Sequence, residues 1–175
     1  LSYRKAIELN PSFTDAYNNI GKVLCDLRRL KDAEFSYRKA IQLNPNFTAA
    51  HYNIGRISID LGKLKDAELS YRKAIELNPN FAICHANLGD LMRDLGKLND
   101  SEFHTRKAIE INPNYAIAQS NLGDLLRDLG KLKDSEFHTR KAIEINPNDA
   151  TAHSNLGDFL RDHGNLKDAE VSARK

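Results

Sequence analysis

Apolar residues recur along the chain with the three-to-four-residue spacing of amphipathic helices, and polar residues fill the arcs between them. When residues are placed 100° apart, one such helical face carries Ala118, Leu122, Leu125, Leu126 and Leu129. A second helical stretch follows each first one after a glycine such as Gly62, placed where a helix end favours a left-handed residue. The pattern predicts paired helices of three to four turns, and Arg28 in the glycine position predicts a strained or differently shaped helix end.

All five prolines follow an asparagine, and successive prolines lie 34 residues apart, at Pro11, Pro45, Pro79, Pro113 and Pro147. Because proline disfavours helical geometry in the residue before it, each Asn-Pro pair closes a second helix. A fixed period of this size indicates a repeat array. The predicted units are 14–47, 48–81, 82–115 and 116–149, with the end of a second helix at 1–13 and a partial unit at 150–175. Positions in each unit are numbered 1 to 34.

Small residues occupy the same positions in every unit. Position 8 is glycine at Gly21, Gly55, Gly89, Gly123 and Gly157, and position 27 is alanine at Ala6, Ala40, Ala74, Ala108 and Ala142. With the proline at position 32, these residues resemble the tetratricopeptide repeat. The resemblance implies an all-α, right-handed superhelical α-solenoid of antiparallel helix pairs whose first helices line a concave groove. Polar residues replace the family's aromatic residue at position 4 (His51, His85, Gln119, His153) and position 24 (Thr105, Thr139), so less packed area is expected there.

Position 6, in the middle of the first helix, is asparagine in every unit: Asn19, Asn53, Asn87, Asn121 and Asn155. Asparagine is a poor residue for a helix interior. A primary amide offers the donor and acceptor that a peptide unit presents, so this row is a candidate site for binding a peptide backbone. It is similar to the asparagine ladder of O-linked N-acetylglucosamine transferase. Two alternatives stay open: hydrogen bonds that fix the spacing between units, and recent duplication.

Charged residues flank the asparagine row and change in character along the chain. The candidate groove charges are Lys22, Arg56, Asp90, Arg93, Asp94, Asp124, Arg127, Asp128, Asp158 and Arg161. An arginine three residues after an aspartate can pair with it along the helix. The pattern therefore fits either a self-neutralising face or a charge gradient that orients a peptide, with basic ligand groups towards Asp124 and Asp158.

The second helices carry an apolar column opposite their buried face: Phe35, Leu69, Phe103, Phe137 and Val171. Arginine and lysine follow it at positions 25 and 26. Such a convex stripe could bind a partner or another copy of the array. Alternatively, its side chains lie against the stems of the neighbouring cations.

Composition narrows the function classes. The 175 residues hold 26 Lys and Arg against 24 Asp and Glu, a net charge of +2 that lacks the basic excess of a nucleic-acid binder. We find neither a membrane-length apolar run nor a leader. Cys25 and Cys84 are expected to be free thiols in a reducing compartment, which favours a cytoplasmic protein. The sequence contains no phosphate loop, nucleophile turn or metal-ligand cluster, and His104 and His138, one repeat apart, are too distant to share a metal ion. We therefore expect neither an enzyme nor a cofactor.

The sequence predicts a protein–protein interaction scaffold that binds an extended peptide or partner protein in the concave groove. The alternative is a structural spacer or self-associating array. The units are closely similar to one another in sequence, and in this they resemble the repeat tracts of cyanobacterial proteins. The resemblance implies that the chain could be the non-catalytic repeat region of a larger glycosyl- or sulfotransferase-like protein. Both ends of the sequence fall within a second helix and lack a capping helix, so end-to-end self-association is expected.

Overall fold

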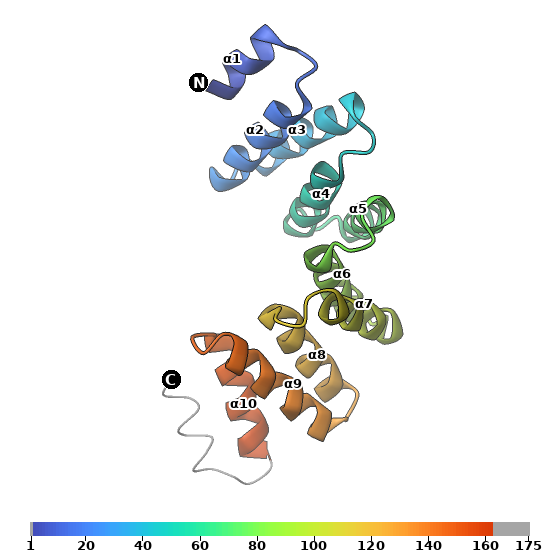
Figure 1. The fold of residues 1–175 in the computed structure, drawn as a ribbon, viewed down its shortest axis with the longest axis vertical. Helices are drawn as coiled ribbons and strands as arrows, with labels where there is room; N and C mark the ends of the chain where they lie inside the picture. The colour runs from blue at the N-terminus through green and yellow to red at the C-terminus, as the bar shows by residue number, and fades with distance from the viewer. Residues whose placement is uncertain (1, 163–175) are drawn as a thin grey trace. The chain divides into compact units, whose positions relative to one another are not determined.

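The computed structural model describes residues 2–162, and every regular element in that range is an α-helix. The helices, labelled in Figure 1, are α1 (Ser2–Leu9), α2 (Thr14–Asp26), α3 (Leu30–Leu43), α4 (Thr48–Asp60), α5 (Leu64–Leu77), α6 (Ala82–Asp94), α7 (Leu98–Ile111), α8 (Ala116–Asp128), α9 (Leu132–Ile145) and α10 (Ala150–Asp162). The all-α architecture of helix pairs is confirmed. Val171 of the predicted convex stripe lies outside the described residues.

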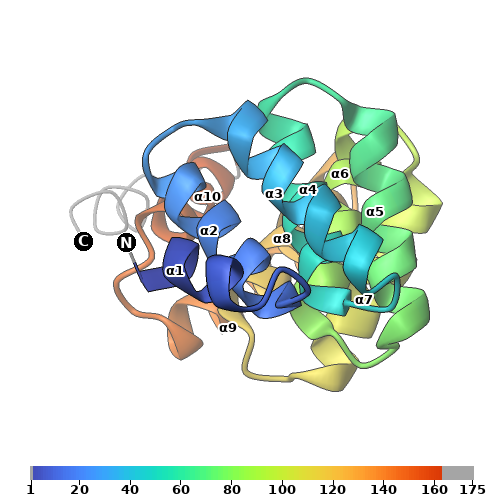
Figure 2. The ribbon, with the colours of Figure 1, turned by 90° about the horizontal axis from the view of Figure 1, so that it is seen from above.

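The chain forms two compact units, which we describe separately: an N-terminal unit, residues 1–84, and a C-terminal unit, residues 85–175. In the N-terminal unit α2 packs against α3 and α4 against α5, as Figures 1 and 2 show. In the C-terminal unit α8 packs against α9, and α9 contacts α10. In these three repeats the first helix, α2, α4 or α8, therefore buries one face against the second helix of its own repeat.

The turn between the paired helices uses the same backbone geometry in every described repeat. Gly62, Gly96 and Gly130 adopt φ values of 70°, 71° and 71°, and Arg28 adopts a φ of 59° at the equivalent position. The next amide, that of Arg29, donates to the carbonyl oxygen of Leu24 over 2.8 Å, the bond that closes a left-handed helix cap. The sequence predicted either a strained or a differently shaped helix end at Arg28. The structure shows the strained one, because the backbone of Arg28 adopts a left-handed conformation that favours glycine.

Each Asn-Pro pair forms a turn that the asparagine side chain stabilises. The Oδ1 atom of Asn44 accepts the Asn46 amide over 3.1 Å, and Asn78 accepts the Asn80 amide over 3.2 Å. Asn44 itself is extended, with φ −138° and ψ 96°. This is the geometry that a following proline imposes. Asparagine therefore ends the second helix through its side chain as well as through the proline that follows it.

The glycine at position 8 makes room for the residue at position 24 of the facing helix. A Cβ atom on Gly55 would lie 2.5 Å from Cδ1 of Tyr71, and a Cβ atom on Gly123 would lie 2.6 Å from Oγ1 of Thr139. The tyrosine of this pair is almost fully buried. Glycine thus recurs because a ring or hydroxyl occupies the space that any side chain would need.

The predicted core face of α8 is confirmed, since Ala118, Leu122, Leu125 and Leu126 are fully buried and Leu129 is partly buried. The first repeat differs. Val23 and Leu27 occupy equivalent core positions in α2, but they are 45% and 62% exposed.

Candidate functional site

One face of α8 carries three of the predicted groove residues, Asn121, Asp124 and Asp128, together with Ile117. Ile117, Asn121, Asp124 and Asp128 lie at intervals of four, three and four residues, so they share one side of the helix. The same positions hold Asn87, Asp90 and Asp94 in α6 and Asn155, Asp158 and Asp162 in α10. The buried core face of α8 lies on the neighbouring arc of the helix, so core packing does not take up this polar face.

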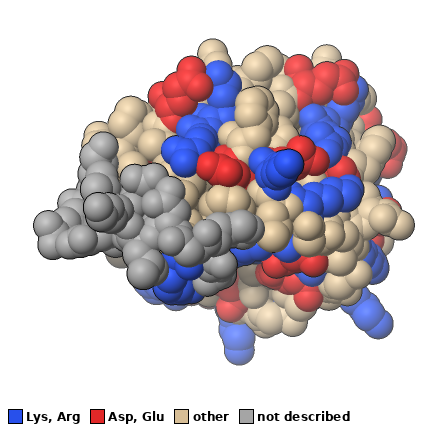
Figure 3. Space-filling model, turned by 90° about the horizontal axis from the view of Figure 1, so that it is seen from below, with Lys and Arg blue, Asp and Glu red and all other residues tan. Residues whose placement is uncertain are grey.

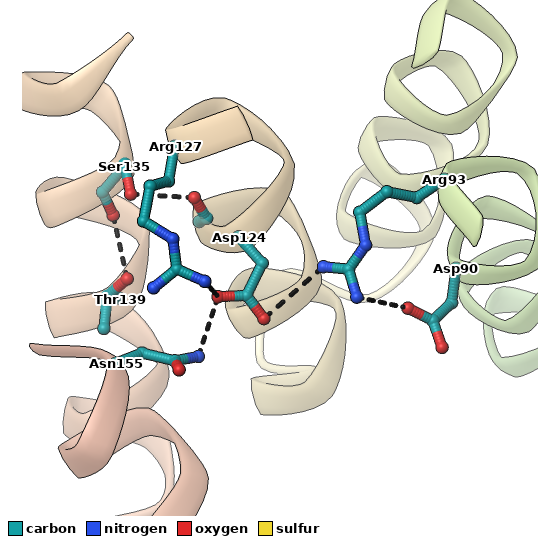
Figure 4. A network of polar contacts seen from close by, with 8 residues as sticks. Asp90, Arg93, Asp124, Arg127, Ser135, Thr139 and Asn155 are labelled. Atoms are coloured by element: carbon teal, nitrogen blue, oxygen red, sulfur yellow. Dashed lines mark hydrogen bonds and ion pairs between the residues drawn. The ribbon is translucent and has the colours of Figure 1, made fainter. Parts of the chain in front are cut away.

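Asp124 joins three successive first helices of the C-terminal unit (Figure 4). Its carboxylate accepts a 2.7 Å hydrogen bond from Nδ2 of Asn155 in α10 and pairs with Arg127 of its own helix at 3.3 Å. From the other side, Nη1 of Arg93 in α6 lies 3.5 Å from Asp124 Oδ2. Arg93 also pairs with Asp90 at 3.3 Å, so one polar network runs from α6 through α8 to α10. The groove charges in this unit therefore contact one another within and between repeats.

Burial has the largest effect on the pKa values of the two carboxylates in this network, Asp124 and Asp90. Burial raises the pKa of Asp124, although the neighbouring Arg127 and Arg93 act in the opposite direction. Burial likewise raises the pKa of Asp90, although Arg93 again lowers it. The two arginines do not fully offset the loss of water around these carboxylates.

The structure divides the predicted asparagine row into two kinds of residue. Nδ2 of Asn53 donates to Oδ1 of Asn18 in the preceding repeat over 2.9 Å, and both residues are buried. Asn155 makes an inter-repeat bond of its own, to Asp124. Asn121 is half-buried, and no side-chain hydrogen bond reaches it from residues 2–162. Inter-repeat bonding therefore explains some members of the row, and Asn121 keeps its donor and acceptor available.

The groove charges of the N-terminal unit have a different setting. Lys22 and Arg56 are exposed, and the guanidinium of Arg56 lies 5.9 Å from the centre of the Tyr52 ring. A cation over an aromatic face is attracted by the ring. The predicted change along the chain, from cations at position 9 here to carboxylates in α6, α8 and α10, is thus matched by a change in what these side chains contact.

The polar residues at position 4, where the sequence suggested lost packing, bind the preceding turn. Nε2 of His51 lies 2.8 Å from the carbonyl oxygen of Pro45, and Nε2 of His153 lies 3.0 Å from that of Pro147. The side-chain amide of Gln119 donates to the carbonyl oxygen of Pro113 over 3.4 Å. Histidine and glutamine both carry a side-chain N–H at a similar distance from the backbone. This shared donor at position 4 is the sequence signal that could have predicted the contact with the preceding turn. The lost ring packing is offset by a hydrogen bond.

Histidine side chains in the second helices also contact position 4. His138 Nδ1 lies 2.8 Å from Gln119 Oε1, and burial lowers the pKa of His138. One repeat earlier, the Nδ1 atoms of His85 and His104 lie 3.1 Å apart in a buried pair. Both second-helix histidines therefore have packed, hydrogen-bonded settings. Within the described part of the chain, no group of three potential ligands could hold a metal ion.

The convex stripe is exposed. The exposed fractions of its side chains are 71% for Phe35, 68% for Leu69, 62% for Phe103 and 63% for Phe137. The cations near them bind glutamates of the same helix, as Arg106 binds Glu102 at 2.8 Å and Lys107 binds Glu110 at 2.8 Å. On the face drawn in Figure 3, basic and acidic atoms are likewise interleaved. In each unit these side chains are therefore exposed apolar residues on a surface whose charges are locally balanced.

Both cysteines are free thiols, as predicted. Cys84 is fully buried, donates to the Tyr71 carbonyl over 3.5 Å, and has its pKa raised to about 12 by burial. Such a thiol is unreactive at neutral pH. Among residues 2–162, none of the helices combines the length and the apolar character that crossing a bilayer requires.

Solved structures with the same fold support the class of helical repeat protein that these helix pairs define. YrrB, a TPR protein with an unusual peptide-binding site, matches with a TM-score of 0.78 and 24% identity over 98% of this chain and 89% of its own. MamA from Desulfovibrio magneticus RS-1 matches with a TM-score of 0.79 and 18% identity over 91% of this chain and 90% of its own. At these identities, the likeness shows the fold.

Sequence models of the tetratricopeptide repeat match residues 14–47, 48–81, 70–103, 116–149 and 138–171. The chain belongs to the tetratricopeptide repeat family. None of the curated proteins matches it. Repeats of this family and the solved structures that share their fold support a protein-interaction scaffold as the general function.

Proposed function

We propose that this protein binds an extended peptide, or an extended segment of a partner protein, along the face formed by the first helices of its C-terminal unit. The observation that carries this proposal is Asn121. Its amide is half-buried on the groove face of α8, and its donor and acceptor have no partner among the described residues. A primary amide in this setting can bind both the N–H and the C=O of a peptide unit.

The neighbouring contacts support the same proposal. Asn155 and Asp124 bind each other across two repeats and fix the spacing between α10 and α8, the helix that carries Asn121. A ligand would therefore meet a preorganised surface, and binding to such a surface loses less conformational entropy. The peptide-binding site of YrrB, which shares this fold, is consistent with this kind of ligand.

The test compares two asparagines of the same row. Asn121→Ala should weaken binding to a library of immobilised extended peptides without changing the thermal unfolding midpoint. Asn53→Ala serves as the matched variant, because it removes the same group where the amide bonds to Asn18 and should lower stability first. Unchanged peptide binding by folded Asn121→Ala would refute the proposal.

A second candidate function is self-association through the part of the convex stripe that lies in the C-terminal unit, which the exposure of Phe103 and Phe137 favours. Their surface charges are balanced by pairs such as Arg106–Glu102, so a second copy of the same face would meet little net repulsion. Sedimentation velocity over a concentration series tests this candidate. Association should disappear in a Phe103→Ser, Phe137→Ser variant, and a wild-type monomer at every concentration would rule it out.

A further inference from the structure

The groove face of α8, in the C-terminal unit, is divided along the helix into an apolar part, an amide part and a carboxylate part. On α8, Ile117 lies near the N-terminus and is 51% exposed. Asn121 follows one turn later, and Asp124 and Asp128 occupy the last two turns. Figure 4 shows how Arg93 and Asn155 bring the adjacent helices against Asp124. The amide of Asn121 thus lies between an apolar edge and an acidic edge.

The acidic edge has more carboxylates than its arginines neutralise. Arg93, Arg127 and Arg161 each pair with an aspartate at position 9 of their own repeat. Asp94 and Asp128, at position 13, are exposed, and neither forms an ion pair within residues 2–162. Each is also the last residue of its helix, where the negative end of the helix dipole opposes a carboxylate. A cation from outside the chain would relieve this unfavourable placement.

The geometry of an extended peptide relates these two edges. In a β-strand the backbone N–H and C=O groups point at right angles to the side chains, and successive side chains point to opposite sides. A strand that turns its backbone groups toward Asn121 must therefore send its side chains alternately toward the Ile117 edge and the Asp128 edge.

We propose that the groove of the C-terminal unit is selective for an extended peptide in which apolar residues alternate with lysine or arginine. This inference rests on the proposed function and adds the chemistry of the ligand. The apolar side chains cover Ile117, the basic ones approach Asp94 and Asp128, and the backbone binds Asn121. An acidic peptide would place its carboxylates against that same acidic edge.

The test uses four dilute, fluorescently labelled ten-residue peptides in anisotropy titrations: valine alternating with lysine, valine with glutamate, serine with lysine, and serine with glutamine. We expect the valine–lysine peptide to bind tightest. The Asp94→Asn, Asp128→Asn variant should weaken it by about fivefold, as expected for two exposed charge pairs. Ile117→Ser should reduce the preference for valine over serine. Raising the salt concentration should weaken wild-type binding more than binding by the aspartate variant.

Asp134→Asn is the matched control, because Asp134 is an exposed aspartate of α9 in the same repeat as Asp128, on the paired helix. Asp134→Asn removes one negative charge, as either single groove substitution does, but it leaves the groove residues intact. It should therefore leave peptide binding unchanged. Equal binding of the lysine and glutamate peptides, or an unaffected aspartate variant, would overturn the selectivity while leaving peptide binding in place. Failure of all four peptides to bind would overturn the proposed function as well.

Discussion

Asn53 Nδ2 donates to Asn18 Oδ1 over 2.9 Å, and this buried hydrogen bond joins the first helices of two successive repeats, α4 and α2. Each amide lies on a helix that would otherwise favour an alanine or leucine. The pair shows that one asparagine of a repeated row can serve the contact between repeats, while Asn121 in the same row serves none among the described residues.

Removing one member of this pair should destabilise the fold. Asn53→Ala leaves the buried carbonyl oxygen of Asn18 without its donor, which costs about 1–3 kcal/mol. Chemical denaturation followed by circular dichroism measures the loss. Asn121→Ala, in which no such bond is broken, should change stability by less than about 0.5 kcal/mol or raise it through helix propensity. Equal losses in both variants would contradict the division of the row.

Arg28→Gly should stabilise the N-terminal unit. Arg28 holds a φ of 59°, a left-handed conformation that costs a residue with a Cβ atom about 1–2 kcal/mol. Glycine removes that strain, and the greater freedom of the unfolded chain offsets part of the gain, leaving about 0.5–1 kcal/mol. Thermal unfolding measures it. The reverse change, Gly62→Ala, is the control, since its φ of 70° is equivalent and an added Cβ meets nothing within 4 Å. It should lower the midpoint.

Gly55→Ala should be destabilising, although alanine is the better helix former. The added Cβ would lie 2.5 Å from the ring of Tyr71, which is only 1% exposed. Overpacking of this kind costs about 1–3 kcal/mol, against a propensity gain of about 1 kcal/mol. Denaturant unfolding distinguishes the two effects, because a stabilised variant would mean that the ring adjusts without cost.

The fold could be predicted from the sequence because its strongest signals are local. Asn-Pro at a fixed spacing and a small residue at position 8 are enough to place the helix pairs, and the structure bears this out. The network around Asp124 could not be predicted in the same way. Its bond to Asn155 joins residues 31 positions apart, and only the rotation between successive repeats decides that position 6 meets position 9. The hydrogen bond from His51 to the carbonyl oxygen of Pro45 was not predicted for a similar reason. From the sequence alone, a histidine in place of an aromatic residue indicates only a loss of packed area.

The pH dependence of stability should reveal the burial of Asp124. Folding raises the pKa of this carboxyl above its ordinary value of 3.8, because burial outweighs the nearby Arg127 and Arg93. A group with a raised pKa stabilises the folded state when it is protonated, and that contribution is lost as the pH rises from the ordinary pKa through the raised one. Asp124→Asn cannot titrate and keeps an oxygen acceptor for Asn155. Its stability relative to wild type should therefore increase as the pH rises through and above the ordinary pKa of 3.8, as measured by denaturant unfolding at each pH. The exposed Asp134→Asn variant should show a smaller change, and a decrease for Asp124→Asn would mean that the ion pairs with Arg93 and Arg127 outweigh burial.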